Sequence, residues 1–249
     1  MEIHHHPDVH HKRKKFKEYF FEFIMIFLAV TLGFFAEGLR EHIGDRTREK
    51  EYMTSLLQEL KYDTSQYNKV LHTVGRLQPQ LDSLYKNLKN AARYNYIIQG
   101  KWNYLMNQTS IEYRPGLPTI RQLLSSGNLR LIESRLVGNK ILEYEAYVKG
   151  NVERLDDNIN TATQKVYGFE DALCDYKYFV TVDLSQKADS STYDMPLVVK
   201  DTIRLNEFAN SFVNYKAIST AYNKTVLDAL KYATELIKLI NNEYHLEKE

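Results

Sequence analysis

The sequence predicts an all-α protein in which one N-terminal transmembrane helix continues into an antiparallel helical bundle. Three observations lead to this prediction. Between Tyr19 and Ala36 the only charged residue is Glu22. From Met53 onward, apolar residues recur at alternating spacings of four and three, which places them on one face of a helix. The breaks between helical stretches are short, and amphipathic helices of this kind bury their apolar faces against one another in a bundle.

The apolar stretch 19–36 is long enough for a bilayer. Its 18 residues rise about 27 Å as an α-helix, close to the hydrocarbon thickness of a membrane. A cleaved export signal would have a shorter apolar stretch followed by small residues, whereas residues 33–38 read GFFAEG. We therefore expect a permanent anchor, with a cleaved signal and a buried soluble helix as the alternatives.

The charges that flank this stretch predict its orientation. Basic residues crowd the N-terminal side, and the cytoplasmic flanks of membrane helices are positive. We expect a single-pass inner-membrane protein with a cytoplasmic tail at residues 1–17 and a transmembrane helix with its flank at 18–42. Residues 43–249 would form a periplasmic helical bundle with a long loop near 180–201, and Gly44-Asp45 is a candidate hinge before it.

Glu22 shares one flank of the expected membrane helix with small residues. At 100° per residue, three of them lie within about 40° of Glu22, and they are Ala29, Gly33 and Ala36. Small side chains let two membrane helices approach closely, and a carboxylate inside a membrane is costly unless it has a partner. This flank therefore predicts an interface with another membrane protein or a second copy. Two alternatives are that Glu22 reaches the lipid headgroups beside Lys15 or Lys17, or that it lines a proton or ion path.

The first 17 residues are rich in histidine and in basic side chains. The histidines could bind a divalent metal, which is the one cofactor that the sequence suggests, and they are His4, His5, His6, His10 and His11. The alternative is a tail that lies against anionic lipid. The candidate headgroup contacts are Lys12, Arg13, Lys14, Lys15 and Lys17.

The remaining chain predicts several helices. The first carries its apolar seam at Met53, Leu57, Leu60, Thr64, Tyr67, Leu71 and Val74. Pro79 predicts a kink or a new helix, Pro118-Thr119 a helix start, and Gly127-Asn128 a left-handed corner. Further helices are expected over 129–144 and 152–178, and more than one in the C-terminal part, the last of them near Tyr244. The tyrosine and phenylalanine rings, 19 and 11 in number, would fill the core.

Composition and motifs argue against two classes of function. Lys and Arg number 33 against 32 Asp and Glu, so no broad basic face is available for nucleic acid. The sequence contains no HExxH, GxSxG, phosphate-binding glycine loop or dinucleotide fingerprint, and its only Glu-x-x-His spacing, Glu2 to His5, lies in the tail. We therefore predict that the protein is not an enzyme. The pair Asp156-Asp157 is expected on a solvated helix face, and Cys174, the only cysteine, forms no internal disulfide.

Two stretches carry a resemblance: residues 1–42 and the segment LLSSGNLRLIESRL at 123–136. Together they resemble an uncharacterised Bacteroidota family of small single-pass inner-membrane proteins with a His-rich N-terminus and a helical periplasmic domain. The resemblance implies an envelope setting and brings no catalytic residues. The expected function is a membrane-anchored scaffold or accessory subunit of an envelope complex. The alternatives are a ligand-sensing periplasmic bundle and metal handling by the tail.

Overall fold

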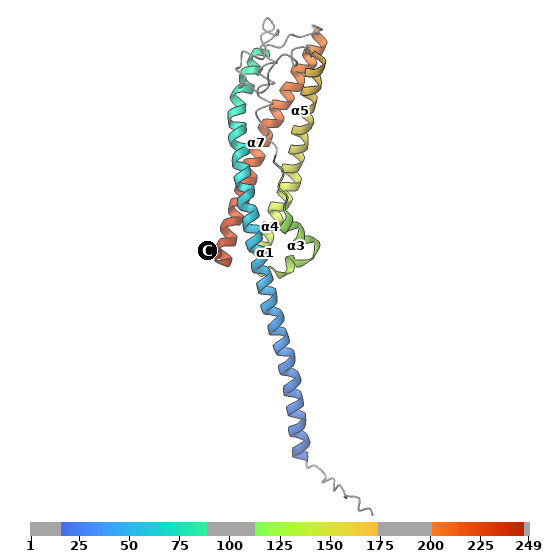
Figure 1. Cartoon of the computed structure of the whole chain (residues 1–249), viewed down its shortest axis with the longest axis vertical. Helices are drawn as coiled ribbons and strands as arrows, with labels where there is room; N and C mark the ends of the chain where they lie inside the picture. The colour runs from blue at the N-terminus through green and yellow to red at the C-terminus, as the bar shows by residue number, and fades with distance from the viewer. Residues whose placement is uncertain (1–15, 89–112, 174–200, 247–249) are drawn as a thin grey trace, which may run out of the picture. The chain divides into compact units, whose positions relative to one another are not determined.

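The computed structural model describes residues 16–88, 113–173 and 201–246, and every regular element in those ranges is helical (Figure 1). The prediction of an all-α fold with a long N-terminal helix is confirmed. The chain divides into two units, Met1–Lys50 and Glu51–Glu249. The predicted long loop near 180–201 lies outside the described residues apart from Asp201, and so does Cys174.

Helix α1, Phe16–Leu88, continues through both positions where the sequence suggested a break. At the expected hinge, the Thr47 hydroxyl donates to the Ile43 carbonyl at 3.0 Å, and Arg48 pairs with Asp45 at 3.5 Å. No new helix begins at Pro79. Proline costs one backbone hydrogen bond, but Leu77 and Leu81 on either side of it are both buried. Tertiary packing therefore holds the helix across the residue that would end an isolated one.

Residues 113–147 contain two short elements before the next long helix. Helix α3, Pro118–Ser125, begins at the predicted proline, and Gly127 adopts the predicted left-handed conformation at φ 70°. The following 3-10 helix η2, Asn128–Leu131, replaces the start of the helix expected over 129–144. Helix α4, Arg135–Tyr147, begins only after Ser134, whose hydroxyl accepts from the Val137 amide at 3.4 Å. The extended backbone at Ile132 and the N-cap at Ser134 therefore separate η2 from α4, whereas the spacing of apolar residues had predicted one helix over both.

A π-helical segment joins two helices that were predicted to be separate. The segment η3, Val148–Glu153, connects α4 directly to α5, Arg154–Leu173, so no new helix begins at Val152. Val148 and Val152 are both fully buried. Because a π turn holds one residue more than an α turn, it keeps both valines on the core side.

The C-terminal part is one helix rather than several. Helix α7, Thr202–Tyr244, is 43 residues long. Asp201 caps its start, accepting from the Ile203 amide at 3.0 Å, and His245 ends it in a left-handed conformation at φ 52°. Tyr244, the last apolar position of the predicted C-terminal pattern, is the last residue of this helix.

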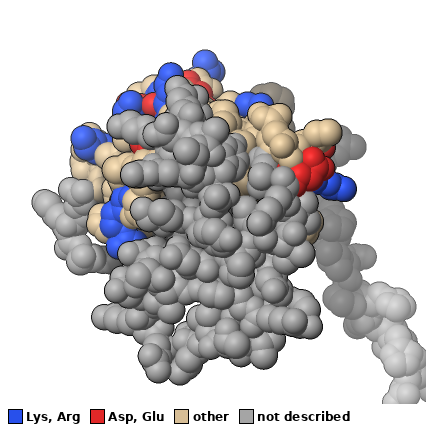
Figure 2. Space-filling model, turned by 90° about the horizontal axis from the view of Figure 1, so that it is seen from above, with Lys and Arg blue, Asp and Glu red and all other residues tan. Residues whose placement is uncertain are grey.

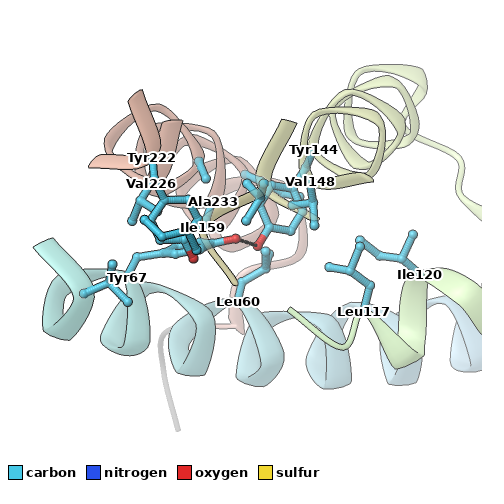
Figure 3. Close-up of a cluster of buried hydrophobic side chains, with 14 of the residues drawn as sticks. Leu60, Tyr67, Leu117, Ile120, Tyr144, Val148, Ile159, Tyr222, Val226 and Ala233 are labelled. Carbon is cyan, nitrogen blue, oxygen red and sulfur yellow. Dashed lines mark hydrogen bonds between the residues drawn. The ribbon is translucent and has the colours of Figure 1, made fainter. Parts of the chain in front are cut away.

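Within residues 51–249, three helical runs share one hydrophobic core: α1, the α4–η3–α5 run and α7. Figure 1 shows α5 and α7 side by side, in agreement with their contacts. Helix α7 runs antiparallel to α1, because Gln78 donates to Ser219 at 3.2 Å whereas Asp82, later in α1, pairs with the earlier residue Lys216 at 2.6 Å. Four tyrosines are completely buried, which confirms that aromatic rings help fill the core: Tyr67, Tyr144, Tyr215 and Tyr222. Figure 3 labels Tyr67, Tyr144 and Tyr222 among the buried side chains.

The buried face of α1 differs from the predicted seam at two positions, Thr64 and Leu71. The structure buries Met53, Leu56, Leu57, Leu60, Asp63, Tyr67, Val70, Val74, Leu77 and Leu81. Thr64 and Leu71 of the predicted seam are only partly buried, and their places are taken by Asp63 and Val70. This shift places a carboxylate in the core.

Candidate functional site

The apolar stretch of α1 is the first candidate site. It contains 18 consecutive residues that are long and apolar enough to cross a membrane, and none of that stretch is buried. The exposed large side chains from Phe16 to Leu39 have between 50% (Leu28, Leu39) and 84% (Phe16) of their surface accessible. Soluble proteins rarely expose so large an apolar patch, and such a patch is typical of a surface that contacts lipid or another protein.

All four residues of the predicted interface lie on this exposed stretch, and the helix is unbroken across them: Glu22, Ala29, Gly33 and Ala36. A Cβ built on Gly33 would meet no atom within 4 Å. Elsewhere on the stretch the rings of Phe23 and Phe27 stack at 6.2 Å, and the Thr31 hydroxyl donates to the Phe27 carbonyl at 2.7 Å. The helix is thus continuous and exposed across these residues, and contact with another helix remains a prediction.

Charged residues gather where the apolar stretch ends. Glu37 and Arg40 form a two-bond pair, with a shortest distance of 2.5 Å, and Arg46 pairs with Glu49 at 2.5 Å. At the other end Lys17 lies exposed in the first turn of α1. The predicted histidine cluster and Lys12, Arg13, Lys14 and Lys15 lie outside the described residues. Within the described ranges, no group of three metal-ligating side chains occurs.

A buried carboxylate with two tyrosine donors is the second candidate site. Asp63, only 5% exposed, accepts from the Tyr113 hydroxyl at 2.5 Å and from the Tyr144 hydroxyl at 2.8 Å. The Tyr144 and Tyr67 hydroxyl oxygens are 3.2 Å apart, and a dashed line marks this hydrogen bond in Figure 3. This tyrosine–aspartate cluster links α1 to α4 and to the segment 113–117 that precedes α3.

Burial sets the protonation of this cluster. It raises the pKa of Asp63 above its usual value, although the hydrogen bonds from Tyr113 and Tyr144 act in the opposite direction by favouring the carboxylate. Burial also raises the pKa of Tyr67, Tyr113 and Tyr144, so these phenols stay protonated and serve as donors. The cluster is therefore suited to fixing helices in place, since every hydroxyl in it is already engaged.

The same region is held by further polar contacts. The Tyr222 hydroxyl of α7 accepts from the Tyr113 amide at 3.0 Å and donates to the Tyr113 carbonyl at 3.3 Å. Glu59 accepts from the Thr119 amide at 3.2 Å and from its hydroxyl at 2.5 Å. Because Leu117 at the N-cap has no side-chain oxygen, the carboxylate of Glu59 on α1 caps α3 from outside the helix.

The prediction that Asp156 and Asp157 both lie on a solvated helix face is wrong for Asp156, which Arg114 contacts. Arg114 donates to Asp156 at 3.0 Å and also contacts Asp157. Asp157 is exposed as predicted, but Asp156 is 5% exposed and belongs to the interior. The arginine thus pairs one buried and one exposed carboxylate on the first turn of α5.

A surface hollow of about 490 Å³ lies against α4 and α7 and is lined by Lys140, Glu143, Asp228, Lys231, Tyr232 and Glu235. Its lysines already have acidic partners, Glu143 at 2.7 Å from Lys140 and Asp228 at 3.1 Å from Lys231. Seen from above, the described surface carries charges of both signs in small groups (Figure 2). Neither feature favours one class of ligand.

The tyrosine–aspartate cluster was missed by sequence reasoning, although one signal for it existed. Counting from Leu60 at spacings of three and four reaches Asp63 and Tyr67, so a strict heptad would have placed the aspartate in the core. The apolar residues alone suggested Thr64 instead. The partners Tyr113 and Tyr144 are 50 and 81 residues away, and no local pattern identifies them.

Comparison with protein-family models, with curated proteins and with solved structures gives no match. The resemblance to a Bacteroidota family therefore stays a prediction, and the functional proposal depends on the exposed apolar stretch of α1.

Proposed function

We propose that this protein is a membrane-anchored scaffold or accessory subunit, held in an inner membrane by the apolar part of α1. The observation that carries the proposal is the exposed apolar stretch of α1, which no described residue shields from water. Each large apolar side chain left in water forgoes about 1.5–3 kcal/mol of burial free energy. Fourteen such side chains occur between Phe16 and Leu39, and a lipid bilayer would cover them all.

The proposed partner is another membrane helix, either of a second protein or of a second copy of this chain. Glu22, Ala29, Gly33 and Ala36 would form the contact, since small residues allow close packing and the carboxylate gains a partner there. The helical unit that follows would bind the same complex on the periplasmic side. The proposal involves no catalytic step.

Anchoring is tested by extraction. Phe27→Arg with Leu28→Arg should release the protein from membranes under an alkaline carbonate wash, because each arginine at the centre of a bilayer costs about 2.5–3.5 kcal/mol on insertion scales. The matched control is Val213→Arg with Leu227→Arg, which alters two exposed apolar residues of α7. Release of the unaltered protein by the same wash would overturn the anchor.

The interface is tested by crosslinking in membranes. Glu22→Leu with Gly33→Leu should abolish crosslinked species that involve this helix, because the added side chains prevent close approach. Thr31→Leu, a substitution of similar size away from that flank, should leave them in place. If the double variant keeps every crosslinked partner, including itself, the proposed interface is wrong.

A further inference from the structure

The surface around α3 and η2 carries an unusual set of exposed residues. Three arginines lie there, Arg121 on α3, Arg130 on η2 and Arg135 at the start of α4, and all three are exposed. None of them has an ion pair within the described part of the chain. Glu133 is the only acidic residue between Arg114 and Leu142. We name Arg121, Arg130 and Arg135 the arginine corner.

Exposed leucines accompany the arginine corner. Leu124 on α3 is 37% exposed and Leu136 on α4 is 54% exposed. Arginine beside exposed leucine is the composition of surfaces that rest on a lipid bilayer, because the guanidinium groups pair with headgroup phosphates while the leucines enter the boundary of the acyl chains. An ordinary solvated surface would offset the arginines with neighbouring acids.

Two hydrogen-bonded connections fix the arginine corner to α1. The Asn128 amide of η2 donates to the Tyr52 hydroxyl at 2.9 Å, and Glu59 holds the first turn of α3 through Thr119. Tyr52 follows Ala36, the end of the apolar stretch, by 16 residues. Chain connectivity therefore keeps this point within about 55 Å of the end of that stretch, even if the intervening chain were fully extended.

We propose that the arginine corner binds the anionic headgroups of the bilayer in which the same chain is anchored. The inference rests on the proposed function, because the anchor supplies the proximity. A tethered site meets its surface at an effective concentration in the millimolar range, where contacts too weak to bind a free partner become populated. A basic residue near an anionic surface strengthens partitioning by roughly fivefold, so three arginines suffice for a tethered site.

The test uses the full chain reconstituted in vesicles. Ser125→Cys, placed in a Cys174→Ser background and labelled with a polarity-sensitive fluorophore, reports on the corner, and Gln164→Cys on α5 is the control position. Vesicles of phosphatidylcholine alone are compared with vesicles containing about one-third phosphatidylglycerol. The fluorescence at residue 125 should rise about twofold in the anionic vesicles and fall again in about 0.5 M NaCl, whereas residue 164 should not respond.

Charge variants separate lipid binding from other causes. Arg121→Glu, Arg130→Glu and Arg135→Glu together should abolish the rise, and the neutral triple variant with Gln should reduce it. The matched control, Lys61→Glu, Lys165→Glu and Lys224→Glu, makes the same change in charge at exposed sites elsewhere and should retain the rise. Helical circular dichroism confirms that each variant is folded.

Three outcomes would overturn the inference. The first is equal fluorescence in neutral and anionic vesicles while the chain remains in the bilayer. The second is an unchanged rise in the glutamate variant. The third is a response on neutral vesicles to added polyglutamate without a response to anionic lipid, which would indicate an acidic protein partner. A chain that fails to float with either kind of vesicle contradicts the proposed anchor instead, so the two failures are distinguishable.

Discussion

At the scale of single residues, Asp63 shows how a buried charge can be both costly and well bonded. Its carboxylate has two tyrosine donors, yet burial still raises its pKa. The folded state therefore binds a proton more tightly than the unfolded state, and the resulting stabilisation is fully present below the unfolded pKa. It is lost as pH rises through the folded pKa.

Asp63→Asn should remove this pH dependence. The amide can accept from one tyrosine hydroxyl and donate to the other, so the contacts survive without the charge. Relative to the native protein, the variant should gain stability as pH rises above the usual aspartate pKa, measured as the urea midpoint in mild detergent at several pH values. Asp63→Leu leaves the Tyr113 hydroxyl unpaired and the Tyr144 hydroxyl with Tyr67 alone, and should instead lose about 1–3 kcal/mol. A difference between Asp63→Asn and the native protein that is constant with pH would contradict this assignment.

At the scale of elements, the π-helical segment η3 follows from the spacing of the buried residues. Tyr144, Val148, Val152 and Asp156 are separated by three successive steps of four, whereas an α-helix that keeps one face buried alternates steps of three and four. The segment Val148–Glu153 absorbs the extra residue.

Deletion of Gly150 should therefore convert η3 into regular α-helix and keep α5 in register. Gly150 is exposed, so the expected loss in free energy of unfolding is no more than about 1–2 kcal/mol. Deletion of Asn160 within α5 should rotate everything that follows by about 100° and remove Ala162 and Val166 from the core. Thermal unfolding followed by circular dichroism compares the two, and similar losses in both would contradict this explanation of η3.

Helix α3 is stabilised by a residue of another element. Glu59→Ala removes the carboxylate that caps its first turn, and should cost about 1–2 kcal/mol while speeding hydrogen exchange of the amides in 118–125. Glu51→Ala, a change at an exposed position earlier in α1, is the control and should alter neither quantity. Unchanged exchange in Glu59→Ala would mean that the hydrophobic contacts of Ile120 and Leu123 hold α3 without the cap.

At the scale of the whole molecule, we propose that lipid surrounds residues 19–36 and that residues 51–249 lie outside the bilayer, with only the surface at the arginine corner in contact with it. The prediction from this arrangement concerns topology. In spheroplasts, protease should digest the helical unit and leave an N-terminal fragment protected, because the basic flank keeps residues 1–17 in the cytoplasm. Replacing Lys12, Arg13, Lys14, Lys15 and Lys17 by Gln should weaken this bias and protect part of the population. Protection of the helical unit in the unaltered protein would reverse the orientation.

The sequence by itself determined what depends on local composition and spacing. The exposed apolar stretch of α1 follows from an uninterrupted run of apolar residues, and the start of α3 at Pro118 and the left-handed Gly127 follow from properties of single residues. Met53, Leu57, Leu60, Tyr67 and Val74 were placed correctly in the core because hydrophobic burial and helical periodicity agree at those positions.

Only the tertiary structure determined the conformation at positions where packing outweighs the local conformational preference of the residue. Pro79 and Gly150 stay within helices because the residues around them are buried against other elements, and that gain outweighs the local cost. Asp63 lies in the core because Tyr113 and Tyr144 arrive there from distant parts of the chain. The arginine corner likewise depends on Tyr52 and Glu59, which α1 supplies. Contacts between residues so far apart leave no local pattern, because the energy that selects them appears only when the chain has folded.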